Sequence, residues 1–135
     1  MIIDTSAVVA ILFGEPDRGA YLTTIRKAHR RAISAATYVE LSIVVDSRHD
    51  PVLSRGLDAL LADLSIEVVD LTVTQARIAR GAHHDFGRGS GNPARLNLGD
   101  CFSYALAKEA DEPLLWKGDG FGHTDVRRPG PAAGA

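Results

Sequence analysis

Short apolar runs alternate along the chain with longer amphipathic stretches, and this alternation predicts the secondary structure. Four runs have the length and the aliphatic or β-branched composition of buried strands. They are Met1–Ile3, Ala32–Ser34, Ile66–Leu71 and Pro113–Lys117. The segment Asp125–Arg128 is a candidate for a last short strand.

Helical periodicity fills most of the chain between these runs, and capping residues and helix breakers mark its limits. The predicted helices are Ala7–Phe13, Arg18–Arg31, Ala36–Val45, Pro51–Leu64, a helix from Thr72 or Thr74 to about His83, and Asn97–Ala110. The segment Asp85–Arg95 is rich in glycine and contains a proline, which favours a loop.

Strands that alternate with helices favour a parallel sheet, because parallel strands need long crossover connections. We therefore expect an α/β fold, a three-layer α/β/α sandwich with a central parallel sheet of about four or five strands. With 135 residues the chain has room for one such domain, residues 1–128. The small residues of 129–135 predict a flexible C-terminal tail.

Composition narrows the classes of protein to consider. No apolar run approaches the ~18–20 residues that span a bilayer, so we expect no membrane contact. Cys101 is the only cysteine, which excludes an internal disulfide and favours a cytoplasmic location. The formal net charge of −2 is not that of a typical nucleic-acid-binding protein. Any contact with nucleic acid must therefore come from local groups of cations.

Four acidic residues are predicted to meet at one edge of the sheet. Asp4 ends the first strand and Asp119 follows the strand Pro113–Lys117, and ligand sites in parallel α/β sheets lie at the carboxyl ends of strands. Glu40 borders the apolar face of its helix, where a charge is costly unless it is paired. Asp100 lies in the first turn of the helix that Asn97 caps.

Each acid also has a purely structural interpretation. Asp4 can cap the helix that follows it, and Asp100 can form a capping box with Asn97. Asp119 suits a glycine-rich turn, and Glu40 can be a solvated helix residue. The case for a site therefore rests on the convergence of the acids.

Clustered carboxylates repel one another, and a bound cation relieves that repulsion. Mg²⁺ and Mn²⁺ prefer oxygen ligands, and such ions support hydrolysis of phosphodiester bonds. The sequence therefore predicts that Asp4, Glu40, Asp100 and Asp119 are both the catalytic residues and the ligands of Mg²⁺ (or Mn²⁺).

Four parts of the chain contain motifs that can be compared with known families: Met1–Ala7, the helix that carries Glu40, Ala94–Ala107 and Leu114–Asp125. Together they resemble the PIN-domain toxins of bacterial VapBC toxin–antitoxin modules. The resemblance covers nearly the whole chain, and the two later motifs are specific.

The resemblance implies a divalent-cation-dependent endoribonuclease that cuts tRNA, rRNA or mRNA. Such toxins are usually homodimers, and a cognate VapB-type antitoxin silences them. The acidic positions of the family correspond to the four acids above, and its hydroxyl after the first acid corresponds to Thr5 or Ser6. Asp125 is a further acid of the last motif and ranks below Asp119.

Cations and apolar residues supply candidates for contacts with RNA and with protein partners. Arg88 and Arg95 flank the loop that leads to Asp100 and are candidates for RNA binding. A basic cluster, Arg26 to Arg31, is either a second RNA contact or a solvated helix face. One apolar group is either core or a surface for a dimer or antitoxin; it comprises Val8, Val9, Ile11, Leu12, Leu41 and Val45.

Two other functions stay open at this stage. One is a PIN-like module that binds RNA or protein without cutting. The other is a metal-dependent nuclease that acts on DNA, because the same kind of metal site can hydrolyse either backbone.

Overall fold

Within residues 1–130, the part of the chain that the computed structural model describes, four parallel strands form one sheet in the order β3-β2-β1-β4. The strands are β1 (Ile2–Ile3), β2 (Ala32–Ser34), β3 (Glu67–Val69) and β4 (Leu114–Leu115). The prediction of a last strand at Asp125–Arg128 is wrong, because this segment is irregular and gives β4 a single bond, from the Leu114 N–H to the Arg127 carbonyl. Residues 131–135 of the predicted tail lie outside the described part.

Six α-helices and one short 3₁₀ helix complete the described fold. They are α1 (Thr5–Leu12), α2 (Arg18–Lys27), α3 (Ala35–Asp46), α4 (Pro51–Asp63), α5 (Val73–Phe86), α6 (Leu98–Ala110) and η1 (Gly120–His123). Side-chain caps that satisfy free backbone N–H groups begin five of the α-helices. The capping residues are Asp4, Ser34, Asp50, Thr72 and Asn97.

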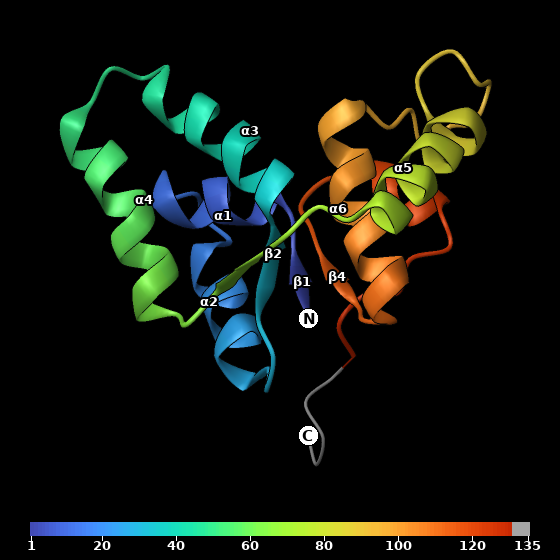
Figure 1. Cartoon of the computed structure of the whole chain (residues 1–135). Helices are drawn as coiled ribbons and strands as arrows, with labels where there is room; N and C mark the ends of the chain where they lie inside the picture. Colours follow the sequence, from blue (N-terminus) through green and yellow to red (C-terminus); the bar gives the residue numbers. More distant parts are fainter. Residues whose placement is uncertain (131–135) are drawn as a thin grey trace.

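Alternate residues of the strands face two separate hydrophobic clusters. Ile3 and Ile33 pack with helices α1 to α4 on one face of the sheet. Ile2 and Ala32 pack with α5, α6 and the segment after β4 on the other face. Figure 1 shows these two groups of helices on either side of the strands. The predicted three-layer α/β/α sandwich is therefore confirmed.

The apolar group that was considered as a partner surface belongs instead to the core. Val8, Ile11, Leu41 and Val45 are at most 2% exposed, and Val9 and Leu12 are half-buried against the same cluster. Of the two interpretations left open for this group, core packing is therefore the one that the structure confirms. The exposed apolar side chains are others, among them Val39, Ile43 and Leu98.

The carboxyl ends of the central strands lie beneath two helices that touch each other. Helix α3 contacts α6, and α6 contacts both β1 and β2. In Figure 1 these helices stand on opposite sides of the strand ends. Side chains from β1, α3 and α6 therefore meet at this edge. No helix within residues 1–130 is long and apolar enough to cross a membrane.

Candidate active site

Asp4 is a buried carboxylate at the carboxyl end of β1, and it is only 3% exposed. Its Oδ2 accepts the Ser6 backbone N–H at 3.0 Å and the Ser6 hydroxyl at 2.7 Å. Its Oδ1 accepts the hydroxyl of Ser103, on α6, at 2.6 Å. The two oxygens of Asp4 thus accept three hydrogen bonds, from one backbone N–H and two hydroxyls. Asp4 thus caps α1 and at the same time faces α6.

Glu40 reaches the same place from α3. Its Oε1 accepts the hydroxyl of Thr5 at 2.7 Å, which ties α3 to the first residue of α1. Its carboxylate lies directly against Gly99, where an added Cβ would stand 1.4 Å from Glu40 Oε2. Glycine at this position therefore makes room for the Glu40 side chain beside the first turn of α6.

Asp100 lies in that first turn and is fixed by a capping box. Its N–H donates to Asn97 Oδ1 at 2.8 Å, and its Oδ2 accepts the Asn97 N–H at 2.9 Å. Burial is the largest cause that raises the pKa of the Asp100 carboxyl, to about 6, and the charges of Asp4 and Glu40 act in the same direction. The Asn97 N–H and the Arg88 charge act the other way.

Three of the four predicted acids therefore come together, from β1, α3 and α6. Within residues 1–130 no three Asp, Glu, His or Cys side chains already stand in an arrangement set to coordinate one metal ion. The donor set nevertheless fits a hard divalent cation, because it consists of carboxylate oxygens alone. Glu40 Oε2 and Asp100 Oδ1 accept no hydrogen bond from the described residues.

Asp119, the fourth predicted acid, and Asp125, the lower-ranked candidate, show no such link to these three acids in the described contacts. Asp119 precedes η1, is exposed and makes no side-chain cap bond there, and it is not among the charges that shift the pKa of Asp100. Its place in the site stays a prediction. Asp125 instead accepts the Tyr104 hydroxyl at 2.7 Å and pairs with Lys108 at 3.0 Å, farther along α6.

The two arginines proposed for RNA binding differ in position. Arg88 is exposed and close enough for its charge to lower the pKa of Asp100. Arg95 is exposed on the same loop, where its backbone has a left-handed φ of 49°. Both therefore stand free in the segment between α5 and α6, and Arg88 has the more direct electrostatic link to the acids.

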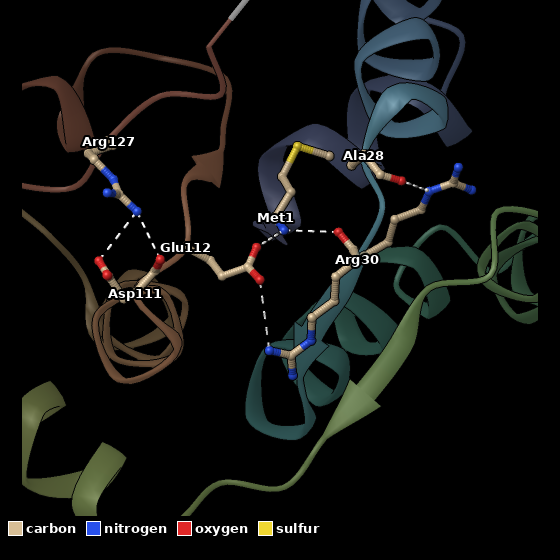
Figure 2. A network of polar contacts seen from close by, with 7 residues as sticks. Met1, Ala28, Arg30, Asp111, Glu112 and Arg127 are labelled. Atoms are coloured by element: carbon tan, nitrogen blue, oxygen red, sulfur yellow. Dashed lines mark hydrogen bonds and ion pairs between the residues drawn. The ribbon is translucent and has the colours of Figure 1, made fainter. Parts of the chain in front are cut away.

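The basic cluster lies at the opposite, amino-terminal edge of the sheet, where it has structural partners (Figure 2). Arg30 lies 3.9 Å from Glu112, which also pairs with the amino group of Met1. Arg31 donates to the carbonyls of Arg26, Ala28 and Leu64 at 2.7 to 3.2 Å.

A pocket of about 560 Å³ opens at this amino-terminal edge and includes Lys27, His29 and Arg30 in its lining. Glu112 is the one carboxylate among the residues that line it. The pocket therefore does not suit a divalent cation. The predicted acidic site belongs at the other edge of the sheet, with Asp4.

Sequence reasoning missed three residues of the site. Gly99 accommodates Glu40, Ser103 binds Asp4, and the Thr37 hydroxyl lies 3.2 Å from that of Ser103. The sequence positions of the two hydroxyl residues could have indicated their role, because Ser103 lies one helical turn after Asp100 and Thr37 one turn before Glu40. The presence of a Ser or Thr in a helix does not by itself indicate a role in a site.

Comparison with known folds defines the class of this protein. The sequence profile of the PIN domain matches residues 1–127. The structure of VapC20 from Mycobacterium tuberculosis, described as a Sarcin-Ricin loop cleaving toxin, superposes with a TM-score of 0.73 at 14% identity, covering 96% of this chain and 98% of that one. A toxin–antitoxin complex from Klebsiella pneumoniae gives 0.67 at 16% identity, covering 89% and 88%. These structural likenesses show the fold alone, which is that of a PIN domain.

Sequence comparison identifies the branch of that class. Ribonuclease VapC28 of Mycobacterium tuberculosis is 56% identical over 128 residues, which are 95% of this chain and 96% of the relative. Ribonuclease VapC42 of the same species is 49% identical over 127 residues, 94% and 97% of the two chains. The chain therefore belongs to the VapC family of PIN-domain toxins.

Proposed function

We propose that this chain is the toxin of a type II toxin–antitoxin system and that it acts in the cytoplasm as an endoribonuclease. The observation that carries the proposal is the convergence of Asp4, Glu40 and Asp100 at the carboxyl ends of the strands. The names of relatives that are 56% and 49% identical over nearly their full length support the class of reaction.

The proposed cofactor is Mg²⁺ or Mn²⁺, which Asp4, Glu40 and Asp100 would hold. Bound there, such a cation would supply Lewis acidity for the hydrolysis of a phosphodiester bond. Asp119 is proposed as a further acid of this site. The hydroxyls of Thr5 and Ser6 hold Glu40 and Asp4 in place.

The chain's own residues orient the groups that meet the substrate. The hydrogen bonds to Asp4 and the capping box of Asp100 fix two carboxylates before any ligand arrives, so little reorganisation is needed. Arg88 and Arg95 supply exposed positive charge on the loop before α6, and we propose that they contact RNA phosphates.

The proposed partners are a cognate VapB-type antitoxin and a second copy of the chain. Val39 and Ile43 on α3 and Leu98 on α6 are 56%, 64% and 69% exposed. They flank Glu40 and Gly99, the neighbours of Asp100, so a protein covering them would also restrict access to the acids. Their exposure supports a protein contact at this place.

A cleavage assay with purified protein tests the proposal. RNA is incubated with the protein in Mg²⁺, Mn²⁺ or EDTA, and cut ends are mapped; a DNA of the same sequence is the parallel substrate. Asp4→Asn and Asp100→Asn should each lower the rate by ~100-fold or more. Asp63→Asn, at the exposed end of α4, is the matched control and should leave the rate unchanged.

Three outcomes would contradict the proposal. Absence of cleavage in any metal would favour a binding module, and cleavage of DNA in place of RNA would change the substrate. Full activity of both Asp→Asn variants would show that Asp4 and Asp100 are not catalytic, although the chain would still belong to the VapC family.

A further inference from the structure

Two buried hydroxyls lie directly behind the acids, one on each of the helices that supply them. Thr37 precedes Glu40 on α3 by three residues, and Ser103 follows Asp100 on α6 by three. Residues three apart share a helix face, so each helix presents a carboxylate and a hydroxyl to the same place. Both hydroxyl residues are 0% exposed.

The hydroxyls form a chain of hydrogen bonds that ends on Asp4. The Ser103 hydroxyl donates to Asp4 Oδ1 at 2.6 Å, and the Thr37 and Ser103 hydroxyl oxygens are 3.2 Å apart. Ser103 has a single hydroxyl proton, and a carboxylate oxygen can only accept. The Ser103 proton is therefore committed to Asp4, and Thr37 must be the donor to Ser103.

Other hydroxyls in the helices of this protein behave differently. Thr23, Thr24 and Ser42 each donate to the carbonyl four residues earlier in their own helix. That local bond is the usual arrangement for Ser and Thr within helices. Thr37 and Ser103 instead pair with each other between α3 and α6, and Ser103 reaches Asp4 as well.

A second branch holds the other oxygen of Asp4. The Ser6 hydroxyl donates to Asp4 Oδ2 at 2.7 Å and accepts the backbone N–H of Lys117 at 2.9 Å. Asp4 is therefore held from α3 and α6 through one oxygen, and from the end of β4 through the other. Removal of one branch leaves the other to keep the side chain near its place.

We propose that Thr37 and Ser103 are positioning residues that orient Asp4 for a divalent cation and set its distance from Glu40 and Asp100. This inference rests on the proposed function. Hydrogen bonds to metal-binding carboxylates typically contribute ~10–100-fold to metal affinity or activity. We therefore expect the pair to affect cation binding more than it affects folding.

Direct measurement of Mn²⁺ binding tests this inference without relying on catalysis. The electron paramagnetic resonance signal of free Mn²⁺ is followed as protein without RNA is added. Ser103→Ala should weaken Mn²⁺ binding by ~10–100-fold. Thr37→Val keeps the side-chain shape without the donor and should weaken it in the same direction. Thr37→Ser, which restores a hydroxyl, should recover most of the affinity.

Ser42→Ala is the matched control, because its hydroxyl donates only to the Tyr38 carbonyl of the same helix. It should bind Mn²⁺ as the wild type does. Circular dichroism melting of every variant separates loss of binding from loss of fold, and Thr37→Val serves if Ser103→Ala does not fold.

If Ser103→Ala and Thr37→Val both fold and bind Mn²⁺ with the affinity of the wild type, this inference is overturned. The proposed function would not be affected by that result. Failure of Thr37→Ser to recover affinity would overturn the inference as well, since hydrogen bonding would then not be the cause. If the wild type neither binds Mn²⁺ nor cleaves RNA, the proposed function falls and the inference falls with it.

Discussion

At the scale of single residues, the contact between Glu40 and Gly99 leaves no room for another atom. The Glu40 carboxylate occupies the space where any other residue would place its Cβ. The conflict falls on the end of a flexible side chain, so it can be relieved by rotation of Glu40. That rotation would break the bond from Thr5 and move the carboxylate away from Asp100.

Gly99→Ala should therefore lose activity while keeping its stability. Alanine favours the helix over glycine by ~1 kcal/mol, which offsets the cost of displacing Glu40. Cleavage should fall to the level of Glu40→Ala, and the urea midpoint should change little. In a Glu40→Ala background the same substitution should raise stability, because nothing is left to displace. Wild-type cleavage by Gly99→Ala would show that the position of Glu40 is unimportant.

A second prediction at this scale concerns Asp100 and pH. Its pKa rises from 3.8 to about 6 in the folded protein, chiefly through burial. The stability that protonated Asp100 contributes is therefore fully present below pH 3.8, and it is lost as the pH rises through about 6. We expect the metal-free protein to lose about 1–2 kcal/mol over this window, less than the full shift implies because the carboxyl is partly exposed.

Urea unfolding in EDTA from about pH 4 to pH 7 measures this loss. Asp100→Asn should flatten the profile, since it removes the titrating group while keeping a side chain that can accept the Asn97 N–H. A wild-type profile that is flat or rises with pH over this window would contradict the burial of the carboxyl.

The structural and functional interpretations of two acids turn out to be compatible. Asp4 caps α1 and Asp100 forms the capping box with Asn97, as the sequence indicated, and the charges of Asp4 and Glu40 both reach Asp100. The roles of Gly99 and Ser103, which contact Glu40 and Asp4, could not be predicted from the sequence, because they depend on contacts between distant parts of the chain.

At the scale of elements, the segment after η1 is fastened to α6. Asp125 accepts the Tyr104 hydroxyl and pairs with Lys108, and Arg128 stacks on the Trp116 ring at 4.1 Å. These contacts replace the strand that was predicted for Asp125–Arg128. They hold the segment against the α5 and α6 side of the sheet.

Tyr104→Phe should weaken this attachment without affecting catalysis. The loss of one hydrogen bond to a charged group is expected to cost ~1.5–3 kcal/mol, or less at this partly exposed site. Asp125→Asn should be destabilising in the same way and should retain cleavage, in contrast to Asp4→Asn. Chemical denaturation and the RNA assay measure the two effects. If Asp125→Asn folds but does not cleave RNA, Asp125 has a role in the active site after all.

Element types were predictable from the sequence, and element boundaries were less so. Helix α2 ends at Lys27 and not at Arg31, because Ala28 turns to an extended backbone and Arg31 donates to the carbonyls near the helix end. Strand β3 is limited to Glu67–Val69 at the edge of the sheet, where it pairs with β2 alone. Hydrophobic pattern alone records neither of these tertiary constraints.

At the scale of the whole molecule, the two hydrophobic clusters share the central strand. Ile2 and Ile3 are both 0% exposed but belong to opposite clusters. The two sides of the sheet therefore depend on the same backbone, and they should unfold as one unit.

Ile2→Ala and Ile3→Ala should each cost ~2–5 kcal/mol, the range for large-to-small changes in a core. Melting followed by far-ultraviolet circular dichroism and by Trp116 fluorescence should give coincident transitions in both variants. Trp116 lies in the cluster of Ile2 only, so it reports on one side. Two separated transitions would show that the halves fold independently.

The position of β1 between β2 and β4 has a consequence for the cell that makes the protein. Asp4 is synthesised long before Asp100, Ser103 and the Lys117 N–H, which complete its surroundings. A nascent chain on the ribosome therefore lacks the assembled acids until α6 and the residues after β4 have been made and have folded onto β1. Any activity of the assembled acids has to wait for this step.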